Sequence, residues 1–193
     1  MSFEMRAIGV VESPYTDIDS VPVQSLLNPD VQGRLRVFDE FVAGLSGLED
    51  FDFAHVLWVL HAGQVGPTDW RNAAEVLRPT PLLLTGTGRR IGVCATRYPV
   101  RPNRIALSLI RIKSIAGGVI EFSGVDMIDR TPVLDIKPWV PALDIPNPPA
   151  GGEFRTGWYA EVDLQSITPA AVTQGKRRRP PSPKRSSHAA ERS

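Results

Sequence analysis

Short alternations of apolar and polar residues recur along the chain, and they predict strands rather than long helices. Residues 33–38 (GRLRVF) place Leu35 and Val37 on one face and two arginines on the other. Residues 105–113 (IALSLIRIK) place Ile105, Leu107 and Leu109 on one face. Residues 55–61 (HVLWVLH) are almost continuously apolar, which predicts a central strand covered on both faces. Further strands are expected over residues 6–12, 89–95, 119–125, 133–136 and 157–162.

The breaks between these segments indicate the fold class. The chain has 18 prolines and 16 glycines, which divide it into short strands. Phe41, Leu45 and Leu48 suit one short helical turn, but no long amphipathic helix alternates with the strands, which argues against a doubly wound parallel sheet. The pattern therefore predicts an all-β fold, either a closed barrel or a sandwich.

The end of the sequence differs from the rest in composition. Residues 174–193 are polar, basic and proline-rich, so we expect them to be disordered. We divide the chain into a domain over 1–169 and a disordered basic tail over 170–193. The tail has seven Lys/Arg and one Glu, which leaves 15 basic and 20 acidic residues in the mildly acidic domain. The tail is either an electrostatic arm for RNA or a solvated segment without a specific role, and we favour the second.

Several classes of protein are not favoured. The N-terminus lacks a long apolar core, and no apolar run is long enough to span a bilayer, so we expect a cytoplasmic protein without membrane contact. The single cysteine, Cys94, excludes an intrachain disulfide, and we expect it to be buried in a strand. His55 and His61 lack further ligands at suitable spacing, so no metal site is predicted. Gly86-Thr87-Gly88 leads into an expected strand, and this favours a hairpin turn over a dinucleotide-binding loop.

Two segments combine charge with stiff backbone. No acidic residue lies between Glu75 and Glu121, whereas this stretch holds eight basic residues. It favours a local anion site, although pairing with acids elsewhere is the alternative. Residues 94–109 (CATRYPVRPNRIALSL) and 126–141 (DMIDRTPVLDIKPWVP) bracket their charged side chains with prolines. Such a density of rigid turns and charges is typical of functional loops on a scaffold.

Several blocks, taken in order, resemble one known family. Residues 8–15 (IGVVESPY) are similar to its opening strand and turn, and 44–51 (GLSGLEDF), with the strand ending at His61, to its second block. Residues 92–97 (GVCATR), 101–103 (RPN) and 107–109 (LSL) are similar to its signature, and 131–138 (TPVLDIKP) to its last block. Over roughly residues 5–145 the chain resembles the tRNA N6-threonylcarbamoyladenosine N6-methyltransferases, also called the TsaA-like, YaeB-like or TrmO family.

The resemblance implies a small antiparallel β-barrel, a homodimer, and S-adenosylmethionine bound beside the barrel near the dimer interface. It implies N6-methylation of threonylcarbamoyladenosine in the anticodon loop of tRNA. The cofactor-contacting positions it implies are Pro22, Gln24, Ser25, His61, Ala62, Arg97, Leu107, Arg130, Thr131, Pro132 and Val133. The substrate- or RNA-binding positions it implies are Arg101, Asn103, Arg104 and Lys137.

The candidates for catalysis are Arg97, Asp135 and His61. Arg97 would pair with the carboxylate of the cofactor or orient the substrate; its alternative is a buried ion pair with Asp135. Asp135, His61 or water would accept the proton that the target nitrogen loses. Two other functions stay open: a regulatory module that binds S-adenosylmethionine without catalysis, and a methyltransferase acting on another small molecule.

The sequence departs from the family pattern at three positions. Arg104 stands where the family usually has proline, and Ala106 and Arg130 stand where it usually has glycine. Arg104 and Arg130 either point to solvent or alter the substrate pocket. These departures affect the expectation about the substrate more than the expectation about the cofactor.

Overall fold

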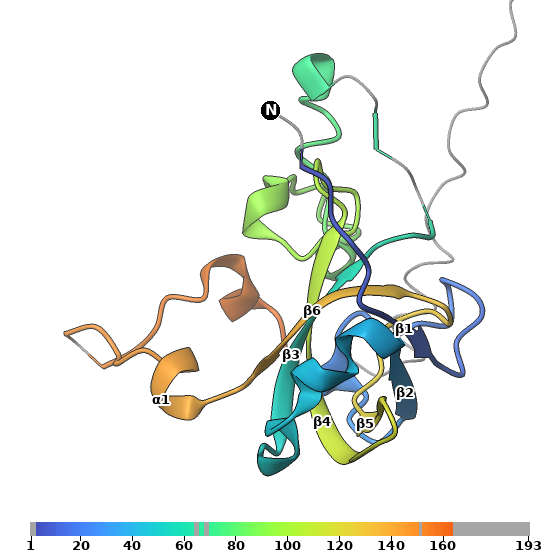
Figure 1. Ribbon diagram of the computed structural model, residues 1–193. Helices are drawn as coiled ribbons and strands as arrows, with labels where there is room; N and C mark the ends of the chain where they lie inside the picture. Colours follow the sequence, from blue (N-terminus) through green and yellow to red (C-terminus); the bar gives the residue numbers. More distant parts are fainter. Residues whose placement is uncertain (1–2, 64–65, 68–69, 151, 164–193) are drawn as a thin grey trace, which may run out of the picture.

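Six antiparallel strands close into a barrel in the order β1-β2-β5-β4-β3-β6 (Figure 1). The computed structural model describes residues 3–63, 66–67, 70–150 and 152–163, with residue 72 in its main chain only. The strands are β1 (Gly9–Glu12), β2 (Gln32–Val37), β3 (Phe53–Val59), β4 (Ile105–Ala116), β5 (Val119–Ser123) and β6 (Pro132–Pro138). The expectation of an all-β antiparallel barrel is confirmed.

Helical structure is limited to short turns, as expected. The described residues form one α-helix, α1 (Pro141–Asp144). They also form 3-10 helices η1 (Ser25–Leu27), η2 (Asp39–Leu45), η3 (Leu48–Asp50), η4 (Trp70–Asn72), η5 (Leu82–Leu84), η6 (Val93–Ala95) and η7 (Gly157–Glu161). No described helix has both the length and the apolar character needed to cross a membrane.

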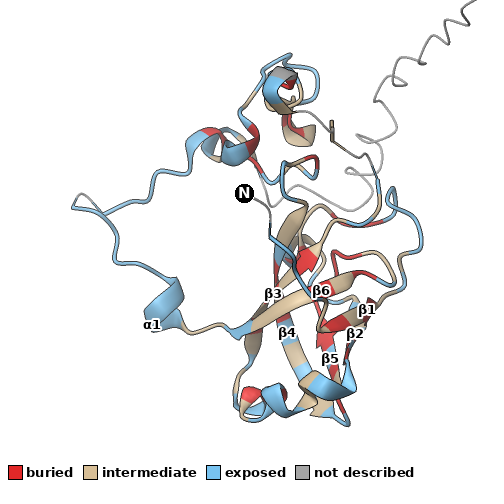
Figure 2. Ribbon diagram, turned by 45° about the horizontal axis from the view of Figure 1, so that its top comes forward, coloured by how far each residue is buried: buried red, intermediate tan, exposed pale blue. Residues whose placement is uncertain are grey.

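The barrel interior is filled by apolar side chains from alternate strand positions. Figure 2 marks the buried residues in red along the strands. Leu35, Ile110, Ile120 and Phe122 have no solvent exposure. Strand β3 lies between β4 and β6, and none of its residues is exposed, in agreement with a central strand. The residues of β4 alternate as predicted, but Ile105, Leu107 and Leu109 are on the outer face, because their alternates Ser108 and Ile110 are the buried ones.

More of the connecting chain lies at one end of the barrel than at the other. Residues 13–31, 60–104 and 124–131 join successive strands, and the antiparallel order brings all three to one end. We call this the loop end. At the other end, residues 38–52 join β2 to β3, and Gly117–Gly118 form a tight turn between β4 and β5. The parts of the two proline-stiffened segments that precede β4 and β6, residues 94–104 and 126–131, therefore meet at one end of the fold.

The long connection from β3 to β4 also contains buried apolar residues. They are Ala73, Leu84, Val93 and Val100. The chain after β6 runs out through α1 and returns to this connection at η7 (Figure 1). There the Trp158 indole donates a hydrogen bond of 2.8 Å to the carbonyl of Ala95. This contact fixes the far end of the exposed arm that follows α1.

Two predicted strands are wrong. Residues 89–95 form an irregular segment ending in η6, because Ile91 and Val93 donate to the carbonyls of Pro79 and Leu77 within the same connection instead of joining the barrel. Residues 157–162 contain η7, since Trp158 is anchored to Ala95 and none of the strands in the described ranges pairs with this segment. Apolar content alone could not distinguish these satellite contacts from strands in the barrel.

Other expectations from the sequence are also corrected, or concern residues outside the described ranges. Cys94 is exposed in η6, not buried in a strand. Gly86 and Gly88 have positive φ angles and form tight turns, but no strand follows, so they do not form a β-hairpin. The first strand begins at Gly9 rather than residue 6. The predicted disordered tail, 170–193, lies outside the described residues, as do the last residues of the expected domain 1–169.

Replacement of Gly9 by alanine tests the packing of β1 on β2. A Cβ atom at Gly9 would lie 2.5 Å from the backbone oxygen of Arg36, so the two strands would have to separate. We expect Gly9→Ala to lower the free energy of unfolding by about 2 kcal/mol or more. Gly44→Ala is the control, because a Cβ there meets nothing within 4 Å. Equal losses in urea unfolding of the two variants would contradict this packing.

Candidate functional site

Most of the candidate site residues converge on the loop end of the barrel. Pro22, Gln24 and Ser25 come from the connection between β1 and β2, which is far away in the sequence from the other two connections. The β3–β4 connection contributes His61, Ala62, Arg97, Arg101, Asn103 and Arg104. The β5–β6 connection contributes Arg130 and Thr131, followed by Pro132 and Val133 at the start of β6.

Arg97 and Gln24 join two of these connections. The Arg97 Nη1 donates a hydrogen bond to the Oε1 of Gln24. The Gln24 amide is oriented by a second bond, because its Nε2 donates to the carbonyl of Val23 at 2.7 Å. Arg97 itself is exposed. A cation held by an oriented amide at the protein surface is suited to bind an anionic group of a ligand.

A buried carboxylate lies beside this pair and was missed by the sequence analysis. Asp126 is only 6% exposed, and both of its oxygens accept hydrogen bonds. The Ser25 backbone N–H donates to Oδ2 at 2.9 Å, and the Ser108 hydroxyl donates to Oδ1 at 2.6 Å. Ser108 in turn accepts from the Trp58 indole at 2.9 Å. The available signal was an acid directly after the strand predicted over residues 119–125, and a serine among the apolar residues of the strand predicted over 105–113.

Burial sets the protonation of Asp126. Desolvation raises the pKa of this carboxyl from 3.8 to about 6, and the hydrogen bonds from Ser108 and Ser25 and the charge of Arg97 oppose the rise. The group is therefore predominantly ionised at pH 7.5. Ionised, it accepts from both donors at once.

His61 is held in one tautomer by Thr131. The Thr131 hydroxyl donates to the carbonyl of Ile128 at 2.7 Å, so its hydrogen is already used. Its oxygen lies 3.3 Å from His61 Nδ1, which must then be the donor. Nε2 of a neutral His61 consequently carries the lone pair. Because His61 is exposed, this nitrogen is available as a proton acceptor or hydrogen-bond acceptor.

Arg101 and Arg104 organise the β3–β4 connection. The Arg101 Nη1 donates to the carbonyls of Val93 and Thr96, each at 3.0 Å. The Arg104 Nη2 donates to the carbonyl of Ala62 at 3.2 Å, next to His61. Both arginines are partly buried. Arg104, one of the departures from the family pattern, thus supports the segment that carries His61.

Arg130 occupies a backbone conformation that favours glycine. It is the one non-glycine residue with a positive φ angle, 64°, among the residues described, and it is exposed. Its backbone N–H donates to the carbonyl of Val11 at 2.7 Å, which ties the turn to β1. A non-glycine residue in this region stores about 1 kcal/mol or more of strain. Glycine, which the family usually has here, would remove it.

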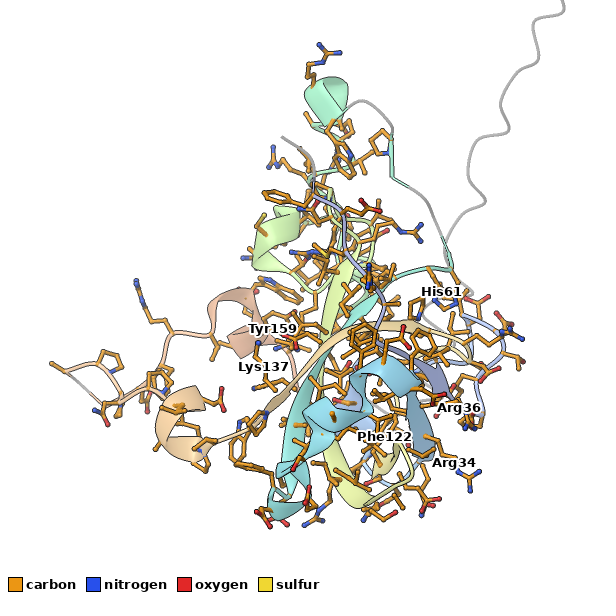
Figure 3. The ribbon with its side chains drawn as sticks, viewed as in Figure 1. Arg34, Arg36, His61, Phe122, Lys137 and Tyr159 are labelled. Atoms are coloured by element: carbon orange, nitrogen blue, oxygen red, sulfur yellow. The ribbon has the colours of Figure 1, made fainter. Side chains whose placement is uncertain are left out.

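Leu107, Asp135 and Lys137 lie on strands rather than in the loop-end connections. Leu107 and Asp135 both pair with Leu57 of β3, one through β4 and one through β6. Asp135 and Lys137 form an ion pair of 2.6 Å, whereas Arg97 bonds to Gln24, so the alternative Arg97–Asp135 pair is not formed. Figure 3 shows His61 and Lys137 on different sides of the barrel. Asp135 also lines a hollow of about 550 Å³ at the other end, with Phe41 and Phe51.

The basic stretch between Glu75 and Glu121 is only partly available for an anion. Arg89 pairs with Glu161, and Arg90 pairs with Glu75. These contacts agree with the alternative of pairing with acids elsewhere, whereas Arg97 bonds to a neutral amide. No group of three or more His, Cys, Asp or Glu within the described ranges is arranged to hold a metal ion.

The raised pKa of Asp126 predicts how stability depends on pH. The folded state holds this proton more tightly than the unfolded chain, so the stabilisation is complete below about pH 4 and is lost as pH rises through about 6. Between pH 5 and pH 7.5, the free energy of unfolding of the parent should fall by about 1 kcal/mol relative to Asp126→Asn. Urea unfolding of both proteins at the two pH values measures this difference. A relative gain by the parent on raising the pH would contradict the assignment.

Comparisons with known proteins identify relatives of this chain. The profile of the tRNA-methyltransferase O N-terminal domain matches residues 10–145. A probable S-adenosyl-L-methionine-binding protein of Pyrococcus abyssi is 34% identical, over 79% of this chain and 74% of that protein. The tRNA (adenine(37)-N6)-methyltransferase of Escherichia coli is 33% identical, over 86% of this chain and 74% of that protein.

Solved structures agree with this match. A crystal structure of TrmO from Pseudomonas aeruginosa superposes with a TM-score of 0.60 at 31% identity, over 81% of this chain and 61% of that one. The chain therefore spans less than two thirds of that solved protein. The recognition made from the sequence blocks is confirmed: this chain belongs to the family of the tRNA-methyltransferase O N-terminal domain.

Proposed function

We propose that this protein is a methyltransferase that uses S-adenosylmethionine to N6-methylate an adenosine in tRNA, threonylcarbamoyladenosine in the anticodon loop. The observation that carries the proposal is the gathering of Gln24, Arg97, His61 and Thr131 at the loop end. The family supports it, because the Escherichia coli relative is a tRNA (adenine(37)-N6)-methyltransferase. Relatives in Pyrococcus abyssi and Archaeoglobus fulgidus are named for binding S-adenosyl-L-methionine, which supports the same cofactor here.

The residues present fit this cofactor by their chemistry. Its methionine part has a carboxylate, for which the exposed Arg97 guanidinium is the matching cation. Its amine and hydroxyl groups need acceptors, and the loop end offers the Gln24 amide and His61 Nε2. When bound, it would supply an electrophilic methyl group: the target nitrogen bonds to the methyl carbon as the carbon–sulfur bond breaks and a neutral thioether leaves. The protein's own part is to hold and orient both reactants and to accept a proton.

His61 is our choice for the proton acceptor. The target nitrogen loses its proton as it gains the methyl group, and the tautomer set by Thr131 leaves Nε2 free of hydrogen. Asp135, the other candidate, pairs with Lys137 on the outer wall and lines the hollow at the opposite end. This placement favours His61 over Asp135.

The proposal has three further parts: tRNA as the partner, assembly as a homodimer, and a cytoplasmic location. An anticodon loop can splay its bases outward, which lets a site among surface loops reach one of them. Leu107 is 48% exposed beside Leu57 on the outer wall, and burial of this apolar wall would favour a homodimer. Asn103 and Arg130 are exposed at the loop end, where RNA would approach, whereas Lys137 lies on the outer wall and is paired with Asp135.

Replacement of Arg97 tests the proposed cofactor site. Loss of the cation should weaken binding of S-adenosylmethionine about tenfold or more, because a charge-assisted hydrogen bond contributes about 1.5–3 kcal/mol. Arg97→Lys should lose less. Arg90→Ala, which removes an arginine of the same basic stretch that pairs with Glu75, is the control and should bind like the parent. Calorimetry gives the affinities.

The matching activity measurement uses labelled S-adenosylmethionine and bulk tRNA, with and without the threonylcarbamoyl group. Label in the modified tRNA supports the proposal. Binding without transfer to either RNA would indicate a regulatory module instead. Absence of binding by the parent, or parental affinity and rate in Arg97→Ala, would contradict the proposed site.

Variants of His61 and Thr131 test the proton acceptor. His61→Ala should lower kcat about a hundredfold, the usual minimum for a general base. Thr131→Val should lower kcat about tenfold, because it removes the oxygen that fixes the tautomer, and Thr131→Ser should restore it. His55→Ala is the control, since His55 lies on β3 and pairs with Asp144. A His61→Ala enzyme with parental kcat in single-turnover methylation would assign the proton to water.

A further inference from the structure

Burial of the Asp126 carboxylate costs free energy, and the packing of the barrel does not require a charged residue at this position. A carboxylate that is 6% exposed loses most of its hydration, and interiors rarely keep such a group without partners. The residues before and after it in the chain, Val125 and Met127, are fully buried and apolar. An apolar residue would fill this position without a charge to stabilise. The partners of the carboxylate therefore indicate what it does.

Those partners come from two other parts of the fold. Oδ1 accepts from Ser108 on β4, inside the barrel wall, and Oδ2 accepts from the Ser25 N–H at the start of η1. One carboxylate therefore fixes the β1–β2 connection to the wall of the barrel. The bond goes to the backbone of Ser25, so it sets the position of the chain rather than of one side chain.

The residue before Ser25 is Gln24, the hydrogen-bond acceptor of Arg97. We infer that Asp126 is a positioning residue for the cofactor site, holding the Gln24–Ser25 backbone so that Gln24 presents the Arg97 guanidinium to the ligand. The inference rests on the proposed function. It adds a residue that does not touch the ligand but controls two that do.

Each hydrogen bond in this network has a fixed donor and a fixed acceptor. The Trp58 indole can only donate, so Ser108 accepts from it and turns its own hydrogen toward Asp126. The Ser25 N–H also can only donate. Asp126 consequently faces two donors, which an ionised carboxylate satisfies and an asparagine does not, because its NH2 group would face one of them. Asp126→Asn keeps the shape and breaks one of these bonds.

The charged group that acts on Asp126 from the β3–β4 connection is the Arg97 guanidinium, whereas Ser25 and Ser108 are neutral. Arg97 is thus connected to Asp126 in two ways: through charge, and through Gln24 and the backbone of Ser25. Loss of the Asp126 charge should weaken both connections. Loss of this charge should therefore lower the affinity for the ligand more than it lowers the rate of the chemical step.

The first experiment measures binding of S-adenosylhomocysteine to the parent and Asp126→Asn by calorimetry at pH 7.5. We expect a tenfold higher Kd for the variant, and a tenfold higher KM for S-adenosylmethionine with kcat within threefold of the parent. The control is Asp129→Asn. Asp129 lies in the same β5–β6 connection and accepts from the Ser13 backbone N–H at 3.0 Å, but it has no bond to Ser25. Its Kd should stay within twofold of the parent.

A double-mutant cycle separates positioning from general damage. If Asp126 acts through Gln24 and Arg97, Asp126→Asn should raise Kd clearly less in an Arg97→Ala background than in the parent. A tenfold loss in both backgrounds would overturn the inference. Ser108→Ala provides a second variant, because it removes one donor to Asp126 and keeps the carboxylate; its effect on Kd should also be smaller in Arg97→Ala than in the parent.

The pH dependence gives an independent result. As the pH falls from 7.5 to 5.5, Asp126 gains its proton, so the Kd of the parent should rise more steeply than that of Asp126→Asn, with the contributions of His61 and of the ligand common to both. Parallel pH profiles would overturn the inference. If the parent itself binds neither S-adenosylmethionine nor its product, the proposed function fails; if the parent binds and Asp126→Asn binds equally well, only the role of Asp126 fails.

Discussion

A carboxylate buried where three connections meet is the constraint that organises the loop end of this barrel. Asp126 is shielded from water and accepts hydrogen bonds from β4 and from the backbone that begins η1. Because an unpaired charge in such a place would cost several kcal/mol, the two donors must stay where they are. The position of Gln24, and with it the hydrogen bond to Arg97, follows from this requirement.

The antiparallel order of the barrel explains why residues distant in sequence can form one site. Each of the three long connections starts and ends at the loop end, so the rigid strands hold them close together. Two of the departures from the family pattern act within this arrangement. Arg104 supports Ala62 beside His61, and Arg130 takes a strained turn that precedes Thr131. Both therefore modify the surroundings of the site rather than its hydrogen-bonding core.

The sequence predicted what depends on periodicity and on contiguous motifs. Alternation located β2, β4 and β5, and the family blocks supplied the barrel and most loop-end residues. The prediction of strands failed where tertiary contacts determine the local structure. Residues 89–95 form hydrogen bonds within the β3–β4 connection, and Trp158 is bonded to the carbonyl of Ala95. Asp126 was also missed, because its importance arises from burial and from Ser25, about one hundred residues earlier. Asp135, conspicuous in its motif, lies on the outer wall instead.

The proposed site puts the ligand at the loop end, and a crystal structure with S-adenosylhomocysteine would show whether it binds there. We expect the ligand between the connections that carry Gln24, His61 and Arg97, with its carboxylate at Arg97 and the Asp126–Ser25 hydrogen bond intact. A ligand seated instead in the hollow between η2 and β6, against Phe41 and Ile136, would contradict it.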